Sequence, residues 1–369
     1  MTTTVRAGVR APQQGPVSNA LTTGQLPRFV EFYVLAGALV LSGGIFALMG
    51  FSWGGFIVIA ILLYLVGLVA LSTIAENRRK ATDRFVRSIV SIAFLLAIAP
   101  LVSTLATVTV KGIGQLNWSF ISQTGGAVFD PATLKVAITT GALQAIVGTL
   151  IITGIAALMS VPIGILTSIY LVEYAKPSSW MARTVTFLVD VMTGIPSIVA
   201  GLFAFSLFTL IAGPKAFSGF SASVALSVLM IPIVVRACEE MLKLVPQDLR
   251  EASFALGVSR FSTITKIVLP TAIAGIITGV MLAIARVIGE TAPIFMAASF
   301  TDNFNSNPFS GPMQTLPVLA YTGYKFPGQD IAASNASAWG AALLLVLIVV
   351  VLNIIARIVA KAFAPKGAR

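Results

Sequence analysis

Two charged side chains, Arg286 and Glu290, interrupt a long apolar run in the second half of the chain. Residues at this spacing lie on one face of a helix. Charged residues inside an apolar span usually face a bundle interior, a partner or a water-filled path. A guanidinium can hold an oxyanion such as phosphate or sulfate through paired hydrogen bonds. Arg286 could therefore attract a passing anion while Glu290 orients it. Alternatively, the two charges could neutralise each other and serve only to ease membrane insertion.

Other polar side chains extend this candidate anion path. Thr291 follows the pair directly, and Arg236 lies at the end of another apolar run. Arg236 could draw an anion toward an exit, or it could be an ordinary positive anchor at the membrane surface. Asp190 would repel an anion, so we expect it to pair with an arginine. The chain has no histidine and a single cysteine, Cys238, so we expect no catalytic residues and no metal site.

The amino-acid composition indicates the class of protein in which these residues lie. The chain has 369 residues, of which 57% are hydrophobic and only 10% charged, and its mean hydropathy is +0.96. Soluble domains are about 45–50% apolar and about 25% charged. These values exclude a water-soluble globule as well as disordered, collagen-like and disulfide-rich chains. The composition therefore predicts an all-α integral membrane protein.

About eight apolar runs are long enough to cross a bilayer, which requires about 20 residues. They cover 30–50, 54–75, 88–109, 142–172, 184–212, 217–236, 270–299 and 337–360. The runs 142–172 and 270–299 exceed one straight crossing, so we expect tilt or an interfacial stretch. The predicted domains are a disordered cytoplasmic tail (1–28), an accessory two-helix hairpin with a basic linker (29–87) and a six-helix core (88–369).

The distribution of positive charge predicts the orientation. With the N-terminus inside, 19 of the 24 Lys and Arg residues lie in cytoplasmic segments, as the positive-inside rule requires. Both termini of a multi-pass protein in the cell (inner or plasma) membrane are then cytoplasmic, and two long polar segments, 111–141 and 301–336, lie outside. The net charge of +11 suits attraction of the cytoplasmic segments to anionic lipid of the inner leaflet. No nucleic-acid partner is therefore expected.

One cytoplasmic loop, 237–270, has a helix–turn–helix pattern. A short amphipathic helix is predicted over 248–256, with acidic residues near its start and Gly257 at the position of a left-handed helix end. A second helix can begin at Ser259 and continue into the next span, with Pro270 at the membrane edge. By itself this pattern also fits a hairpin lying on the inner leaflet.

The spacing within this loop resembles the EAA loop of ABC importer permeases. The matching residues are Glu251, Ala252, Gly257, Ile267, Leu269 and Pro270. Ser253 occupies the place of the second Ala. The resemblance implies a six-helix type I importer core whose loop helix docks on a cytoplasmic ATPase and transmits its movement into the membrane. No phosphate-binding loop for ATP occurs in this chain, so the partner is expected to bind ATP and Mg, and this chain is expected to be no enzyme and to carry no cofactor.

Two further motifs are similar to those of phosphate permeases of the PstA type. One is Arg286–Ile294, which resembles their ARxxGETAP stretch, and the other is Gly194–Gly201. The resemblance covers roughly 88–360. It implies a phosphate importer built with a PstC-type second permease, a PstB-type ATPase dimer and an extracytoplasmic PstS-type phosphate-binding protein. The alternatives are a sulfate or molybdate importer, and an ion-gradient-driven transporter, which the EAA loop disfavours.

Overall fold

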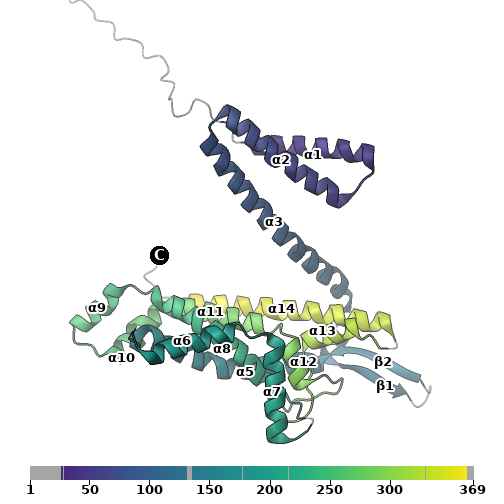
Figure 1. Cartoon of the computed structure of the whole chain (residues 1–369). Helices are drawn as coiled ribbons and strands as arrows, with labels where there is room; N and C mark the ends of the chain where they lie inside the picture. Colours follow the sequence, from purple (N-terminus) through teal and green to yellow (C-terminus); the bar gives the residue numbers. More distant parts are fainter. Residues whose placement is uncertain are drawn as a thin grey trace, which may run out of the picture. The chain divides into compact units, whose positions relative to one another are not determined.

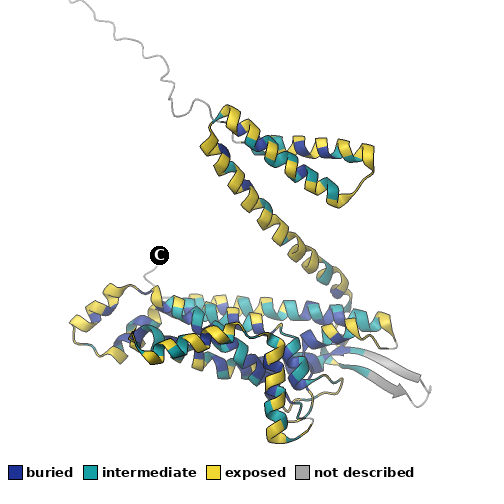
Figure 2. Cartoon of the chain, viewed as in Figure 1, coloured by how far each residue is buried: buried dark blue, intermediate teal, exposed yellow. Residues whose placement is uncertain are grey.

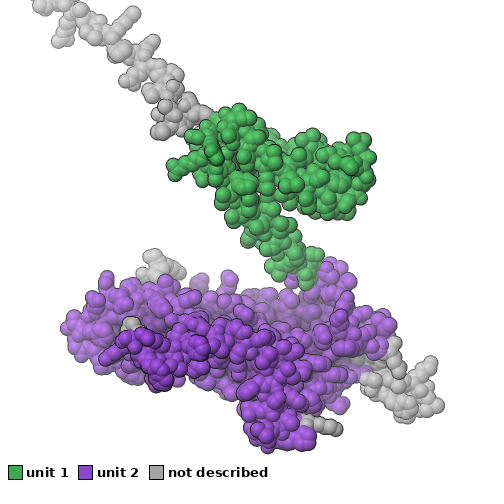
Figure 3. Space-filling model, viewed as in Figure 1, with its two compact units in different colours: residues 1–104 green, residues 105–369 purple. Residues whose placement is uncertain are grey.

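The structure is a computed structural model that describes residues 26–27, 29–130, 135–176, 178–214, 216–328 and 330–363 (Figure 1). Within these ranges, side chains are described except at 127–130, 135–139 and 363. Apart from Leu26 and Pro27, the tail expected over 1–28 lies outside the described residues. The chain forms two compact units, which divide between residues 104 and 105 (Figure 3).

The first unit contains a hairpin of two apolar helices and most of a third helix. The helices are α1 (Val30–Met49), α2 (Trp53–Ala75) and α3 (Arg78–Gly112). The basic segment expected as a linker is helical and forms the first turns of α3. Most side chains of α1 and α3 and about half of those of α2 are exposed (Figure 2), as expected for helices that contact lipid or partners rather than the interior of their own chain.

A cluster of charged side chains ties the three helices together at one end. The Arg84 guanidinium contacts Glu31 at 3.3 Å and Glu76 at 3.0 Å, and Arg87 also pairs with Glu31. Glu76 additionally accepts hydrogen bonds from the Ser72 hydroxyl and the Leu26 amide. With Arg84 as the main cause, these contacts lower the pKa of the Glu76 carboxyl to about 2.

The second unit begins with short elements that precede its helical bundle. They are a 3-10 turn (Ile113–Gln115), α4 (Trp118–Ser122), β1 (Thr124–Asp130) and β2 (Lys135–Ala142). The strands pair antiparallel, with Ala127 opposite Ile138. Only a polar segment was expected here, so the hairpin is an unpredicted addition to the helices of the described residues.

Ten further helices and two π-helical turns complete the unit. They are α5 (Leu143–Ile169) with the π turn Tyr170–Tyr174, α6 (Trp180–Thr193), α7 (Ser197–Ala212), α8 (Gly219–Lys243), α9 (Gln247–Ala255), α10 (Arg260–Thr263) with the π turn Ile264–Val268, α11 (Leu269–Val287), α12 (Ala292–Ala298), α13 (Leu316–Lys325) and α14 (Ile331–Phe363).

The centre of this unit is the parallel pair α5 and α8. Ser223 and Ser227 of α8 donate hydrogen bonds to the carbonyls of Ile152 and Ala156 on α5. Moving four residues along α8, from Ser223 to Ser227, moves the partner four residues in the same direction along α5. The two helices therefore run parallel. The intervening α6 and α7 must therefore carry the chain back along the length of the bundle.

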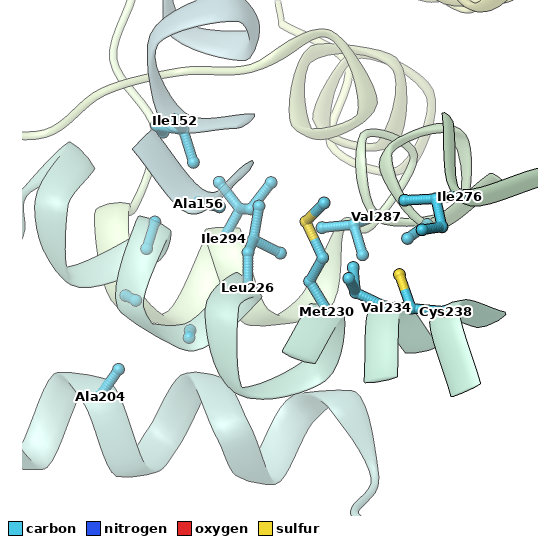
Figure 4. Close-up of a cluster of buried hydrophobic side chains, with 14 of the residues drawn as sticks. Ile152, Ala156, Ala204, Leu226, Met230, Val234, Cys238, Ile276, Val287 and Ile294 are labelled. Carbon is cyan, nitrogen blue, oxygen red and sulfur yellow. The ribbon is translucent and has the colours of Figure 1, made fainter. Parts of the chain in front are cut away.

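A buried apolar cluster fills the space between α8 and its neighbours (Figure 4). From α8, Leu226, Met230, Val234 and Cys238 contribute side chains, and the facing residues include Ile152, Ile276, Val287 and Ile294. α11 runs antiparallel to α8, since Gly275 faces Met241 and Gly279 faces Ala237. Close packing of these small and branched side chains fixes the bundle around α8.

Two expected spans are interrupted, and one of them, 270–299, was expected to be too long for a single straight crossing. The run 184–212 is divided into α6 and α7, which meet at 104°. Pro196 causes this break because it lacks an amide hydrogen and disfavours helix at the preceding residue. The run 270–299 is divided between α11, which ends at Val287, and α12.

The all-α membrane class is confirmed. In the described residues, seven helices are long and apolar enough to cross a membrane, and the bent α6–α7 pair brings the number to eight. This agrees with the expectation of about eight spans.

Candidate functional site

The loop between α8 and α11 has the predicted helix–turn–helix form. α9 ends at Ala255, and Gly257 follows with φ of +74°. Nothing lies within 4 Å of a Cβ built at Gly257, so the requirement for glycine comes from its backbone conformation. Ser259 caps α10 by accepting a hydrogen bond from the Ser262 amide at 3.3 Å. The expected turn at Gly257 and helix start at Ser259 are thus confirmed.

A buried ion pair anchors α9 to the ends of α5 and α8. The Arg250 side chain is 9% exposed, and its Nη2 lies 2.7 Å from Oε1 of Glu173, which is 7% exposed. Arg250 also donates to the carbonyls of Val245 at 2.6 Å and Leu242 at 2.9 Å. One guanidinium therefore fixes α9 against two helices of the bundle. This role was not predicted, because Glu173, which Arg250 contacts at the end of α5, lies 77 positions away in the sequence.

Ser253 joins α9 to the following helix. Its hydroxyl lies 2.8 Å from the Thr263 hydroxyl, and both side chains are buried. An alanine at this position would leave the Thr263 hydroxyl without this partner. The serine that replaces the second alanine of the EAA pattern thus has a hydroxyl partner on α10. This contact joins the two helices that flank the turn at Gly257.

The outer surface of α9 remains open. Glu251 and Ala252 are exposed, as are Phe254 and Leu256, the latter with 83% of its surface accessible. Exposed apolar side chains on a rigidly anchored helix are typical of a surface that binds another protein. The other predicted loop residues lie where α11 begins: Ile267 and Leu269 are half-buried, and Pro270 is exposed.

Arg236 lies in a network of carboxylates and does not act as a free cation. It pairs with Asp190 of α6 and, at 2.8 Å, with Glu239 one turn along α8. Glu239 also contacts Lys243 at 2.7 Å. The expectation that Asp190 pairs with an arginine is confirmed. Because two carboxylates already compensate Arg236, these contacts favour its structural role, and its place in an anion path stays a prediction.

Arg286 and Glu290 do not share a helical face, so that part of the sequence prediction is wrong. α11 ends at Val287, and Glu290 lies in the following turn, where its amide donates to the Val287 carbonyl at 3.1 Å. Arg286 is exposed, Glu290 and Thr291 are half-buried, and neither charge has an ion pair among the described residues. A mutually neutralising pair is therefore not what the structure shows.

The interrupted helices place the segment that follows α11 beside the buried centre of the bundle. Val287 lies beside Met230, in the middle part of α8 (Figure 4). α12 then packs against α7, where a Cβ at Gly201 would be only 2.6 Å from the Pro293 Cα. Unwound backbone at such depth is tolerated in membranes where it is covered by protein or lines an aqueous path. The segment 288–291 is thus a candidate part of a translocation path.

The fold and the anchored loop define a class: a polytopic membrane protein with a loop helix, α9, that leaves apolar side chains exposed. Residues 160–368 match the family model described as the binding-protein-dependent transport system inner membrane component. The chain belongs to this family.

Curated relatives are similar over most of the chain. A protein named phosphate transport system permease protein PstA 1 from Mycobacterium tuberculosis (strain CDC 1551 / Oshkosh) is 41% identical over 283 residues, which cover 76% of this chain and 90% of that protein. The PstA protein of Pasteurella multocida (strain Pm70) is 37% identical over 281 residues, covering 76% and 95% respectively.

A solved structure shares the fold at lower identity. It is a bacterial alginate ABC transporter in complex with an alginate pentasaccharide-bound periplasmic protein. The match covers 80% of this chain and 100% of that chain, with a TM-score of 0.51 and 13% sequence identity. This likeness supports the architecture of the bundle.

Proposed function

We propose that this chain is the permease subunit of an ATP-driven phosphate importer and forms half of its translocation path. The observation that carries the proposal is the anchored helix α9, whose open surface can dock a driving subunit while Arg250 ties it to the bundle. The substrate assignment is supported by relatives named phosphate permeases at 37% and 41% identity.

The contacts of Arg250 suggest how docking would drive transport. Movement of α9 would pull on the carboxyl-terminal ends of α5 and α8 together, because Arg250 bonds Glu173 at one and the Leu242 and Val245 carbonyls at the other. These two helices form the centre of the bundle. α8 in turn packs against α11 and α12, which flank the candidate path. In this way a contact made at α9 would change the arrangement of the helices in the whole bundle.

The proposed assembly contains a homologous second permease, two ATPase subunits and an extracytoplasmic phosphate-binding protein. ATP and Mg would be bound by the ATPase, and this chain would carry no cofactor and catalyse no reaction. Both termini would be cytoplasmic, which places α9 on the ATPase side. Arg286, Glu290 and Thr291 would line the anion path, where binding must remain weak enough to permit release.

A pull-down from membranes tests the proposal. The tagged chain should recover a second permease, an ATPase and a phosphate-binding protein together, and the purified binding protein should retain phosphate in preference to sulfate and molybdate. Recovery of a binding protein selective for sulfate or molybdate would overturn the substrate assignment. Transport activity from a chain that recovers no ATPase would overturn the ATP-driven mechanism.

A further inference from the structure

A depression of about 890 Å³ lies beside the docking helix. Its walls come from the end of α5, from α6, from the end of α8 and from α9. α9 contributes Gln247, Glu251 and Phe254 to one wall. These residues follow helical spacing, so one face of the docking helix borders the depression. A ligand bound here would therefore contact the element through which the permease is proposed to be driven.

The lining residues leave an excess of positive charge. Three of the four lining carboxylates are already compensated, in the pairs Glu173–Arg250, Glu239–Lys243 and Asp190–Arg236. Lys176, Arg183 and Arg260 also line the depression, are exposed, and form no ion pair with any described residue. Glu251 is the remaining lining acid. Three uncompensated cations against one carboxylate create a local field that favours an anion.

One of these cations is held in a defined position. The Arg260 guanidinium carbon lies 5.3 Å from the centre of the Tyr174 ring, a cation–π contact. Tyr174 ends the π turn that follows α5. Its contact with Arg260, the first residue of α10, holds the guanidinium at the edge of the depression. The guanidinium still has donors available for a ligand, because its N–H groups form no hydrogen bond with any described residue.

The outer surface of α6 is apolar and exposed beside the same depression. The exposed fractions are 79% for Trp180, 58% for Met181, 64% for Phe187 and 53% for Leu188. Phe187 also lines the depression. An amphipathic helix with an exposed tryptophan next to basic residues is typical of the interface between the membrane and water. The depression is thus lined by basic side chains and lies next to the exposed apolar surface of α6.

We propose that this depression binds the phosphate-bearing headgroup of an anionic phospholipid. Lys176, Arg183 and Arg260 contact the phosphate, and the acyl chains lie over the apolar side chains of α6. Basic pockets on the cytoplasmic side of membrane helices are known to bind such headgroups. Free phosphate shares this chemistry, but the depression is much larger than one phosphate ion requires, and the apolar approach suits a lipid. The inference rests on the proposed function, which places α9 at the cytoplasmic membrane surface.

Binding is measured on the intact purified complex in neutral detergent, by titration with a fluorescent phosphatidylglycerol. Phosphatidylcholine and inorganic phosphate serve as competitors. The triple variant Lys176→Gln/Arg183→Gln/Arg260→Gln is compared with Arg79→Gln/Arg357→Gln/Lys361→Gln, which removes the same charge from exposed positions outside this depression. Each basic residue near an anionic surface contributes on the order of fivefold in affinity. We expect the first triple variant to lose on the order of a hundredfold and the control to stay near wild type.

The outcomes separate the alternatives. Equal affinity in the two triple variants would overturn the site. Displacement by inorganic phosphate at concentrations similar to those of the lipid would overturn the lipid assignment in favour of a free anion. An absence of lipid binding by the intact complex would overturn the proposal. Subunit composition is recorded on the same sample, so failure of the lipid site is distinguished from failure of the proposed assembly.

Discussion

At the scale of single residues, Arg250 shows how one buried charge can hold a short loop helix, α9, in place. Its guanidinium bonds a carboxylate and two backbone carbonyls, so the desolvation of the charge is offset by several partners. Removing one member of a buried pair is more harmful than replacing both, because the remaining charge stays uncompensated.

Glu173→Ala should therefore weaken the anchoring of α9 by about 3–5 kcal/mol. We expect most of the co-purifying ATPase to be lost while the chain still inserts into the membrane. The double variant Glu173→Leu/Arg250→Leu should retain more ATPase than Glu173→Ala alone. Glu240→Ala, which removes an exposed acid from α8, is the matched control. The measurement is the ratio of ATPase to permease after affinity purification; unchanged ratios in all variants would contradict the anchoring role.

Arg286 is expected to act on phosphate directly. Loss of hydrogen bonds to a charged group costs about 1.5–3 kcal/mol, so Arg286→Gln should lower phosphate uptake at least tenfold with the complex intact. Arg286→Lys should recover part of the activity, because lysine restores the positive charge but not the paired hydrogen bonds of the planar guanidinium. Because no ion pair joins Arg286 to Glu290, the double variant with Glu290→Gln should not regain function. Wild-type uptake by Arg286→Gln, measured beside quantified complex, would remove it from the path.

Glu76 gives the first unit a dependence on pH. Its folded pKa of about 2 lies below the ordinary value of 4.5. The carboxylate therefore stabilises the contact between the end of α2 and the start of α3 fully above pH 4.5, and this contribution is lost as pH falls toward 2. Spin labels on α2 and α3 should report a narrow distance distribution at neutral pH that broadens across this window. Glu76→Gln should show the broad distribution throughout; a variant that still sharpens with rising pH would assign the effect to another group.

At the scale of elements, the turn at Gly257 sets the direction of the docking helix. Gly257→Val should introduce about 1–3 kcal/mol of backbone strain, displace α9 and reduce co-purifying ATPase. Gly257→Asn should be tolerated better, because asparagine adopts positive φ more readily. Gly154→Val on α5, where a Cβ also meets open space but φ is not positive, controls for added bulk. Full ATPase recovery with Gly257→Val would show that the turn is not required.

Local patterns in the sequence were sufficient for most elements but not for their long-range contacts. Apolar runs predicted the spans, and acidic residues followed by Gly257 predicted the loop helix and its end. The Arg250–Glu173 pair joins residues 77 positions apart, and no local pattern encodes it. Hydrophobicity continues through 184–212 and gave no sign of the 104° bend between α6 and α7. The strands β1 and β2 lie in a segment whose polarity masked their pairing.

At the scale of the whole molecule, the chain combines a permease bundle with an additional helical hairpin. The charge cluster of Glu31, Glu76, Arg84 and Arg87 belongs to the first unit, whereas the apolar cluster around α8 belongs to the second. Each unit thus has its own stabilising contacts. The second unit should not need α1 and α2 in order to fold.

A chain that begins at Glu76 should accordingly insert with unchanged orientation. Arg78, Arg79, Lys80, Arg84 and Arg87 would remain as its cytoplasmic signal, and assembly with the second permease should survive. Cysteine labelling from either side of the membrane reports the orientation, and co-purification reports the assembly. Inverted labelling of the truncated chain would show that the hairpin determines topology.

The central claim is that this chain carries phosphate across a membrane under the control of a separate ATPase. Its most direct test is accumulation of radiolabelled phosphate in proteoliposomes that contain the purified complex with its binding protein. We expect uptake that requires ATP and the binding protein, is resistant to excess sulfate and molybdate, and falls strongly when Glu173→Ala releases most of the ATPase. Phosphate accumulation that proceeds without ATP, or uptake that sulfate displaces as readily as phosphate, would contradict the account.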